Sequence, residues 1–437
     1  MADVVVLGAG AAGLAAARRL ASTGLRVTVL EARNRIGGRI HTFHDPGWPL
    51  PVEAGAEFIH GQPEELWSAV RAAGLAAYEI SGQHWHVRAG RPQPLDFTHL
   101  WDKIFSRLQK LSGPDLSFAD FLQRQCPSAP PDAKAQATAY VEGFNAADSH
   151  AVSALWLRES DYASGQGGGG NAFRIQNGYD SVMKWLAAGI RPDTCDVRLS
   201  TLVSAIHWQR GQVRVEAASA AGVPLEPLQA ACAVITFPLG ILRAPPDAPG
   251  AVCFSPDLTQ KWAACASLKM GPVVKVVLRF REAFWEKGDL HDLGFLHTPE
   301  GPFQVWWTTR PLRTAVLTAW AGGPAADRLA GHEEQALLAR VLDALAGSFQ
   351  TDRGRLASLL DAWHVFDWQG DRFARGAYSY VAVGGLDAPA RLAEPVEDTL
   401  FFAGEATHDR LSGTVAGAMA SGYRAAEDVL RARRRAS

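Results

Sequence analysis

The sequence predicts an α/β protein, and three features of its first 31 residues support that prediction. An apolar run, Val4–Leu7, is typical of a buried parallel strand, and the glycine-rich turn GAGAAG at Gly8–Gly13 follows it directly. An alanine-rich helix is predicted over Leu14–Ser22, and a second strand over Val27–Leu30 leads into Glu31. Strand, turn, helix, strand and acid at this spacing predict a Rossmann-like domain that binds a dinucleotide.

The chemistry of a dinucleotide explains each part of this opening. Glycines let the backbone approach a pyrophosphate, and the positive end of the following helix attracts it. Glu31 is placed to accept hydrogen bonds from ribose hydroxyls. A glycine-rich turn alone is weak evidence, because such turns are common, but here the strands, the helix and the acid accompany it.

Composition and charge argue against several classes of protein. The chain of 437 residues has room for two or three domains, and 47% of its residues are apolar. Its net charge of −2 gives no reason to expect nucleic acid or an anionic membrane surface as a partner. No apolar run reaches membrane-spanning length, and the first strand leaves no room for a signal peptide before it, so we expect a soluble, cytoplasmic protein.

Metal sites and disulfides are not expected. The five cysteines are scattered and form no CxxC pair, which indicates neither a disulfide framework nor a thiolate metal site and fits a reducing compartment. No HExxH motif is present. The histidines His84, His86, His297 and His364 are interpreted as structural.

The organisation along the chain is discontinuous. Apolar residues recur at helical spacing from Phe97 to about Arg158, and Gly165–Gly170 is expected to be a loop. The segments predicted after it are strands at Val197–Trp208, Val213–Glu216, Ala233–Phe237, Val273–Phe280 and Val316–Trp320, a helix near Glu334–Leu345, a strand at Thr399–Ala403 and a helix over Val415–Arg431.

Two further fragments, read together with the first turn, indicate which dinucleotide is bound. The first is Glu31–Arg39 (EARNRIGGR), and the second is Phe401–Thr407 (FFAGEAT) followed by Ser412–Val415 (SGTV). Together they resemble the FAD-dependent amine oxidases, a group that includes the monoamine oxidases, the polyamine and spermine oxidases, and the flavin-dependent histone lysine demethylases. The resemblance extends over the whole chain, with ordered matches at Glu53–Ala56, Thr236–Leu239, Val274–Val277, Phe284–Trp285 and Arg375–Tyr380.

The resemblance implies a discontinuous FAD-binding domain of residues 1–80, 195–251 and 396–437. Residues 81–194 and 252–395 would form a substrate-binding domain of mixed β-sheet flanked by helices. The positions that it assigns to the cofactor are Gly8, Gly10, Ala12, Gly13, Glu31, Arg33, Gly37, Gly38, Arg39, Gly55, Ala56, Phe58, Val203, Trp368, Gly404, Glu405, Thr414 and Val415.

Several of these positions have more specific implied roles. Glu31 would bind the adenosine ribose, Val203 would present backbone groups to the adenine, and Glu405 would contact the diphosphate and ribityl region. The amide of Val415 would face the flavin ring. Ala377 occupies the position where monoamine oxidases attach FAD through a cysteine, so FAD is expected to bind non-covalently.

Lys275 has two interpretations. On the pattern alone it alternates with Val273, Val277 and Arg279 on one face of a strand, and that face can be solvated or can line a site. The resemblance places this lysine at the flavin N5, where it would hold a water near the position of hydride acceptance and oxygen activation.

Tyr378, Thr414 and His60 are the other residues implied in catalysis. Tyr378 falls on one ring position of the aromatic cage that amine oxidases build in front of the flavin, and Thr414 falls where monoamine oxidases have the second ring. His60 matches a histidine that animal-type polyamine and spermine oxidases carry near the substrate. Phe58 stands where amino-acid oxidases tend to carry an arginine for the substrate carboxylate, which disfavours amino-acid substrates.

The activity implied by the resemblance is oxidation of an amine C–N bond. Hydride transfer to FAD would give an imine that hydrolyses to an aldehyde, and dioxygen would be reduced to hydrogen peroxide. The expected partners are therefore dioxygen and a small amine, polyamine-like or another non-amino-acid amine. Two alternatives stay open: a desaturase or dehydrogenase with another electron acceptor, and a non-catalytic FAD-binding protein. The oligomeric state is not predicted.

Overall fold

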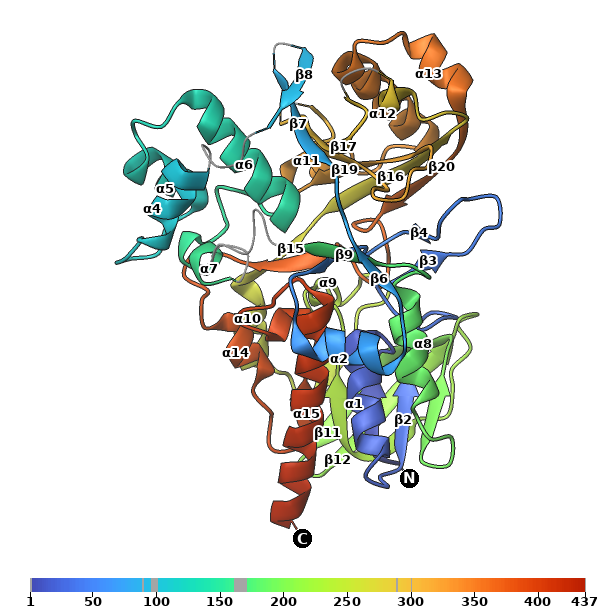
Figure 1. The fold of residues 1–437 in the computed structure, drawn as a ribbon. Coiled ribbons are helices and arrows are strands. Elements are labelled where there is room, and N and C mark those ends of the chain that lie inside the picture. The colour runs from blue at the N-terminus through green and yellow to red at the C-terminus, as the bar shows by residue number, and fades with distance from the viewer. Residues whose placement is uncertain are drawn as a thin grey trace.

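The computed structural model of the chain describes residues 2–88, 90–95, 101–160, 171–287, 290–299 and 301–436. Two large β-sheets organise these residues (Figure 1). The lower part of the view holds the first sheet with both chain ends, and the upper part holds the second sheet and a block of helices. The predicted loop Gly165–Gly170 lies outside the described residues.

The first sheet combines a parallel core with antiparallel strands. Its strand order is β10-β2-β1-β13-β12-β11-β14, and β22 pairs with β13. The bounds are β1 Ala2–Leu7, β2 Val27–Leu30, β10 Cys195–Arg198, β11 Thr201–Gln209, β12 Gln212–Ser219, β13 Leu228–Ile235, β14 Cys253–Ser255 and β22 Leu400–Phe402. Strands β10, β2, β1, β13 and β22 pair in parallel with one another, β12 pairs antiparallel with both β13 and β11, and β14 pairs in parallel with β11. The sheet therefore assembles strands from both ends and the middle of the chain.

Helices cover this sheet. They are α1 (Ala11–Ala21), α2 (Glu64–Ala72), α8 (Asp180–Ala188) and α15 (Val415–Ala436). Helix α15 lies along α1 in Figure 1, and the two backbones pack so closely that a Cβ at Gly422 would stand 2.2 Å from the carbonyl oxygen of Ala12. Helix α1 begins three residues before the predicted start, because the last residues of the glycine-rich turn already form its first turn: the amide of Leu14 donates to the carbonyl of Gly10.

The second sheet has the order β20-β16-β19-β18-β17-β7-β8. The bounds are β7 Gln83–Arg88, β8 Arg91–Pro94, β16 Val273–Phe280, β17 Leu293–His297, β18 Val305–Thr308, β19 Val316–Gly322 and β20 Leu360–Asp367. Its pairs are antiparallel except β17 with β7. Nearby helices are α11 (Pro324–Asp327), α12 (Glu334–Phe349) and α13 (Arg353–Leu359). Strand β16 has the predicted bounds, and α12 extends four residues past its predicted end.

Helices dominate residues 101–160, as predicted for Phe97 to about Arg158, although residues 97–100 of that prediction lie outside the described residues. They are η1 (Trp101–Phe105), α4 (Ser106–Gln109), α5 (Phe118–Gln125), α6 (Pro131–Asn145) and α7 (Ala154–Glu159). The hydroxyls of Ser117 and Ser153 cap α5 and α7 by accepting backbone N–H groups.

Short elements join the large parts. They are β3 (Thr42–Phe43), β4 (Val52–Glu53), β5 (Ile59–His60), β6 (Ala77–Glu79), β9 (Ala172–Ile175), β15 (Leu268–Gly271), β21 (Tyr378–Val381), α9 (Leu239–Leu242), α10 (Thr259–Ala266), η3 (Phe284–Glu286), α14 (Ala388–Ala393) and η5 (Glu405–Thr407). Strands β15 and β21 pair, and β9 pairs with both β5 and β6.

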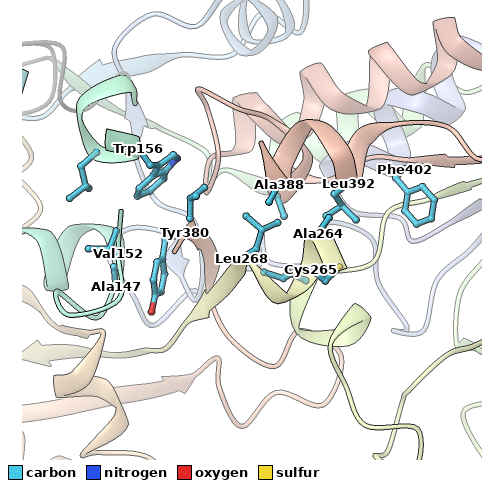
Figure 2. Close-up of a cluster of buried hydrophobic side chains, with 14 of the residues drawn as sticks. Ala147, Val152, Trp156, Ala264, Cys265, Leu268, Tyr380, Ala388, Leu392 and Phe402 are labelled. Atoms are coloured by element: carbon cyan, nitrogen blue, oxygen red, sulfur yellow. The ribbon is translucent and has the colours of Figure 1, made fainter. Parts of the chain in front are cut away.

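The hydrophobic core is continuous between the helical block and the first sheet. Figure 2 shows Val152 and Trp156 of the block near Tyr380 of β21, with Leu268 of β15 and Leu392 of α14 beyond them and Phe402 of β22 at the far end. Among the residues that the structure describes, no helix combines the length and apolar character needed to cross a membrane.

Candidate active site

A cavity of about 920 Å³ runs from the glycine-rich turn of the first sheet to the aromatic residues of the second. The predicted residues on its wall are Gly8, Gly10, Ala12, Glu31, Arg33, Gly37, Gly38, Arg39, Gly55, Ala56, Phe58, His60, Val203, Lys275, Trp368, Tyr378, Gly404, Glu405, Thr414 and Val415. Residues from distant parts of the sequence thus share one space.

Gly13 is the predicted residue that this wall does not include. A Cβ at Gly13 would stand 1.9 Å from the carbonyl oxygen of Gly8, so its small size serves close packing inside the turn. Gly8 itself has φ +111°, a conformation that glycine adopts readily. The amide of Gly37 donates to the carbonyl of Ala9 at 2.8 Å, which joins the first turn to the second glycine pair.

Glu31 directly follows β2 and is buried, with 6% of its surface exposed. One carboxylate oxygen accepts the amide of Ala9 at 2.7 Å, and the other accepts the amide of Arg33 at 2.9 Å. The predicted acid therefore also fixes the glycine-rich turn.

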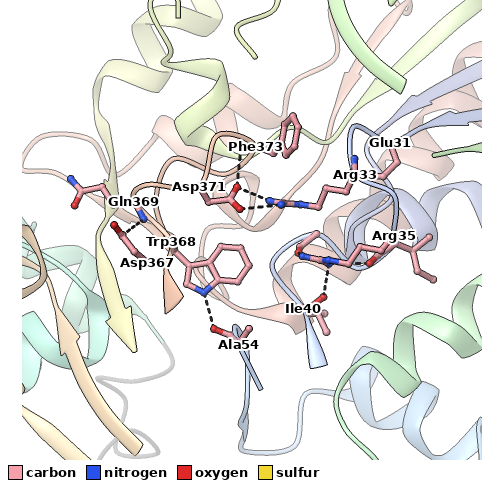
Figure 3. A network of polar contacts seen from close by, with 12 residues as sticks. Glu31, Arg33, Arg35, Ile40, Ala54, Asp367, Trp368, Gln369, Asp371 and Phe373 are labelled. Atoms are coloured by element: carbon pink, nitrogen blue, oxygen red, sulfur yellow. Dashed lines mark hydrogen bonds and ion pairs between the residues drawn. The ribbon is translucent and has the colours of Figure 1, made fainter. Parts of the chain in front are cut away.

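Asp371, which the sequence did not indicate, holds Arg33. Figure 3 shows the Arg33 guanidinium between Glu31 and Asp371, and its two nitrogens donate to Asp371 at 2.6 and 3.0 Å. Burial opposes ionisation of Asp371, but the hydrogen bonds and charge of Arg33 lower its pKa below the ordinary value. Arg35 donates to the carbonyls of Gly38 and Ile40 and braces the second glycine pair.

Trp368 and Thr414 are fixed by hydrogen bonds to the backbone. The Trp368 indole donates to the carbonyl of Ala54 at 2.9 Å (Figure 3). The Thr414 hydroxyl donates to the Leu411 carbonyl and accepts the Gly417 amide, so it caps the first turn of α15.

Lys275 is buried, with 1% of its side chain exposed, so the interpretation of a solvated strand face is wrong. It lies in β16, between β19 and β20, and its side chain reaches the cavity wall. Its Nζ donates to Oε2 of Glu57 at 2.6 Å.

Glu57 is the centre of a cluster that the sequence analysis did not identify. Its Oε1 accepts from Nε and Nη2 of Arg174 at 2.9 and 2.6 Å and from the Trp307 indole at 3.0 Å. Burial alone would raise the pKa of Glu57, but the charges of Lys275 and Arg174 and their hydrogen bonds hold it well below its ordinary value. The signal in the sequence that could have identified Glu57 is an ionisable residue between the apolar residues Ala56 and Phe58.

Aromatic rings surround this end of the cavity. Tyr378 donates its hydroxyl to the carbonyl of Phe144 at 2.7 Å. Phe58 lies 5.5 Å from the Trp307 ring, and His60 lies edge-on to Phe144 at 5.3 Å, between ring centroids. The His60 ring is accessible from the cavity, yet the surrounding protein desolvates it and lowers its pKa to about 4.

Three histidines for which the sequence indicated only structural roles line the same cavity, His84, His86 and His297. Nδ1 of His84 lies 3.1 Å from Nε2 of His297, and Gln136 bonds His86. Burial lowers the pKa of His84 to about 4 and of His297 to about 3. His364 lies elsewhere and stacks on Trp48. Within the described ranges, no group of three or more His, Cys, Asp or Glu side chains is placed to hold a metal ion.

The cavity wall fits FAD in shape and chemistry. At Gly404, φ is +128° and a Cβ would meet no atom within 4 Å, so the backbone there faces open space. Glycine backbone at one end permits close approach of phosphates, and a buried acid suits a ribose. Aromatic rings at the other end suit a flat ring system. Ala377 on this wall carries no nucleophile for a covalent bond.

Comparison with known proteins supports the same conclusion. The family model of flavin-containing amine oxidoreductases matches residues 11–430. Polyamine oxidase 3 of Oryza sativa subsp. japonica is 30% identical over 98% of this chain and 88% of its own length.

Two solved structures are also similar. Putrescine oxidase bound to putrescine has 21% identity and a TM-score of 0.83 over 98% of this chain and 99% of its own. Cyclohexylamine oxidase from Brevibacterium oxydans IH-35A has 25% identity and a TM-score of 0.81 over 100% of both chains. The chain therefore belongs to the flavin-containing amine oxidoreductases and is an FAD-dependent amine oxidase whose cofactor is bound without a covalent link.

Proposed function

We propose that the physiological substrate is a polyamine-like or other non-amino-acid amine and that dioxygen is the electron acceptor. The observation that carries this proposal is the buried Lys275 on the wall of the same cavity as the glycine-rich turns. Phe58 supports the exclusion of amino acids, because an apolar ring offers nothing to a carboxylate. The nearby Arg174 guanidinium is already paired with Glu57.

The proposed reaction is a two-electron oxidation of the amine by dioxygen. The carbon that bears the amine loses hydrogen with two electrons, the nitrogen loses a proton, and the resulting imine takes up water to release an aldehyde and an amine or ammonia. Dioxygen accepts two electrons and two protons and leaves as hydrogen peroxide. Bound FAD supplies this redox chemistry.

The first sheet supplies the groups that hold the cofactor. Gly8, Gly10, Gly37 and Gly38 would give the pyrophosphate access to the backbone, and Glu31 would accept from the ribose. Arg39 and Glu405 would bind the middle of the cofactor. The amide end of α15, beginning at Val415, would face the ring, where a helix N-terminus favours negative charge.

The second sheet and its neighbours orient the amine. Tyr378 is held by its bond to Phe144 and presents one ring of the cage. The Thr414 hydroxyl is already engaged in hydrogen bonds at the start of α15. The small size of the Thr414 side chain leaves room for a longer or bulkier substrate. Desolvation by the surrounding protein lowers the pKa of His60 to about 4, so a neutral ring near pH 7 can exchange hydrogen bonds with a polar group of the substrate.

Lys275 would hold a water beside the ring and stabilise the negative charge that develops as dioxygen accepts electrons. A fixed ammonium at a buried position acts strongly, because little solvent screens it.

An anaerobic titration tests the proposed function. Polyamines, acetylated polyamines, arylalkylamines and cyclic amines are added in turn, and the flavin absorbance is followed. Bleaching by a polyamine with rapid recovery in air is expected. Slow recovery in air would instead assign a dehydrogenase with another acceptor, and bleaching by arylalkylamines alone would overturn the polyamine-like substrate.

We also propose a cellular location and a division into domains. We place the protein in the cytoplasm, which the five cysteines support because none forms a disulfide. The FAD-binding domain is proposed to comprise 1–80, 195–251 and 396–437, although β14 of the first sheet lies just beyond 251.

A further inference from the structure

We infer that Glu57 is a positioning residue that keeps Lys275 as an ammonium ion at the cavity wall. This inference rests on the proposed place of Lys275 beside the flavin. It assigns to Glu57 a role in the oxygen reaction that neither the motifs nor the comparisons indicate.

The contacts of Glu57 divide between its two oxygens. Oε1 is used by three donors, the two Arg174 nitrogens and the Trp307 indole, whereas Oε2 accepts Lys275 at 2.6 Å. Arg174 also donates to the carbonyl of Thr308 and is itself 8% exposed. The carboxylate is therefore fixed in orientation from β9 and β18, and one oxygen is left to hold the lysine.

The charges around Lys275 show what removal of Glu57 does. The ionisable groups coupled to this pair are Glu53, Arg174 and Tyr78, and the centroid of the Trp307 ring lies 5.6 Å from Nζ. Without Glu57, two buried cations face each other with no carboxylate between them. Burial and like charge both favour the loss of a proton, and lysine can lose one whereas arginine stays charged.

Glu53 is a second buried carboxyl group coupled to Lys275. Burial raises the pKa of Glu53 to about 8, even though the Tyr179 amide and the Thr42 hydroxyl donate to its carboxylate. The charge of Glu57 contributes to this raised pKa, so in the wild type near pH 7 Glu57 is the carboxylate that balances Lys275.

The test uses the holoenzyme reduced by light and EDTA, which requires no amine substrate. The reduced enzyme is mixed with air-saturated buffer from pH 6 to pH 8, and the return of oxidised-flavin absorbance is followed. We expect a nearly constant rate for the wild type. For Glu57→Gln we expect a rate at least tenfold lower at pH 8 than at pH 6, because the positive charge survives only at the lower pH.

Arg174→Gln is the matched variant. It removes the competing cation from the same carboxylate but leaves Glu57 with Lys275, so no decline toward pH 8 is expected. Glu57→Asp keeps the charge and should restore most of the wild-type profile. A readout without turnover is the flavin midpoint potential, which in Glu57→Gln should fall below the wild-type value at pH 8 and approach it at pH 6, since a nearby positive charge favours the electron-rich cofactor.

Two outcomes overturn the inference. One is a profile of Glu57→Gln as flat as that of the wild type, and the other is the same alkaline decline in Arg174→Gln, which would indicate general loss of packing. If Glu57→Gln fails to fold or to retain FAD, Glu57→Asp decides, because its shorter side chain holds Nζ less closely: a partial decline toward pH 8 supports the inference, and a profile identical to that of the wild type overturns it. Failure of the amine panel leaves this test intact, because light replaces the amine, and a flat profile in an enzyme that oxidises amines rejects only the role of Glu57.

Discussion

Arg39 and Glu405 form a partly buried ion pair across 366 positions of sequence, with Nη1 2.7 Å from Oε1. The Glu405 side chain is 5% exposed, and its second oxygen accepts from Ser379 and from the Gly413 amide. Both residues were predicted to contact the cofactor separately. The structure adds that each also fixes the other, so the two motifs at opposite ends of the chain form one wall.

Lys275→Met tests the active-site lysine directly. Methionine keeps the length and the apolar stem but removes the three donors, and Glu57 keeps Arg174 and Trp307 as partners, so FAD should still bind. We expect reoxidation of the reduced enzyme by air to slow at least tenfold. Stopped-flow measurement of both half-reactions checks this.

Lys184→Met is the control for that variant, because its side chain on α8 is 60% exposed. Both rates of Lys275→Met within about twofold of the wild type would remove Lys275 from the active site, since a tenfold change corresponds to about 1.4 kcal/mol.

Glu31→Ala should lower FAD content on purification. The change leaves ribose hydroxyls unpaired, at a cost of roughly 1–3 kcal/mol, and it also frees the Ala9 amide of the turn. The ratio of flavin to protein absorbance and the FAD dissociation constant measure the effect. Glu64→Ala on the surface of α2, where the side chain is 75% exposed, is the control. Full retention of FAD with unchanged affinity would place the ribose contact elsewhere.

Gly13→Ala should prevent correct formation of the glycine-rich turn. The added Cβ would meet the backbone oxygen of Gly8 at 1.9 Å, and backbone cannot move aside as a flexible side chain can. We expect loss of FAD and a lower melting temperature. Gly347→Ala in α12 is the control, because its Cβ would meet nothing within 4 Å and alanine is the better helix former, so the melting temperature should rise slightly. Equal melting temperatures for the two variants would contradict the packing role of Gly13.

Acid should destabilise the protein through His84 and His297. Burial lowers their pKa values to about 4 and about 3, whereas an unfolded chain protonates histidine near pH 6.5. Between pH 6.5 and pH 4 the unfolded state binds more protons, so the free energy of unfolding falls as the pH falls. Each histidine contributes a slope of up to about 1.4 kcal/mol per pH unit in this range.

Urea unfolding of the cofactor-free protein at pH 6.5, 5.5 and 4.5 measures that slope. The double variant His84→Gln, His297→Gln should lose less stability toward acid than the wild type. His150→Gln, at an exposed position, should leave the slope unchanged. An unaltered slope in the double variant would show that other groups carry the acid sensitivity.

The sequence by itself determined the elements whose causes are local. The glycine-rich turn, the strand bounds of β2 and β16 and the acid at position 31 follow from short patterns, because periodicity and glycine act over a few residues. Helix bounds were less well predicted: α1 began at Ala11 instead of Leu14, and α12 continued to Phe349. At helix ends, capping and packing contribute as much as residue propensity.

The tertiary structure alone decided which side chains are buried and paired at the cavity. Alternation along β16 is the same whether Lys275 faces water or protein, and only the cover supplied by other segments buries it. Its partner Glu57 lies 218 positions away, and His84 meets His297 across 213. Such pairings are set by which strands become neighbours. Charge and burial at a site therefore follow from the packed fold, whereas the backbone geometry that approaches the cofactor is encoded locally.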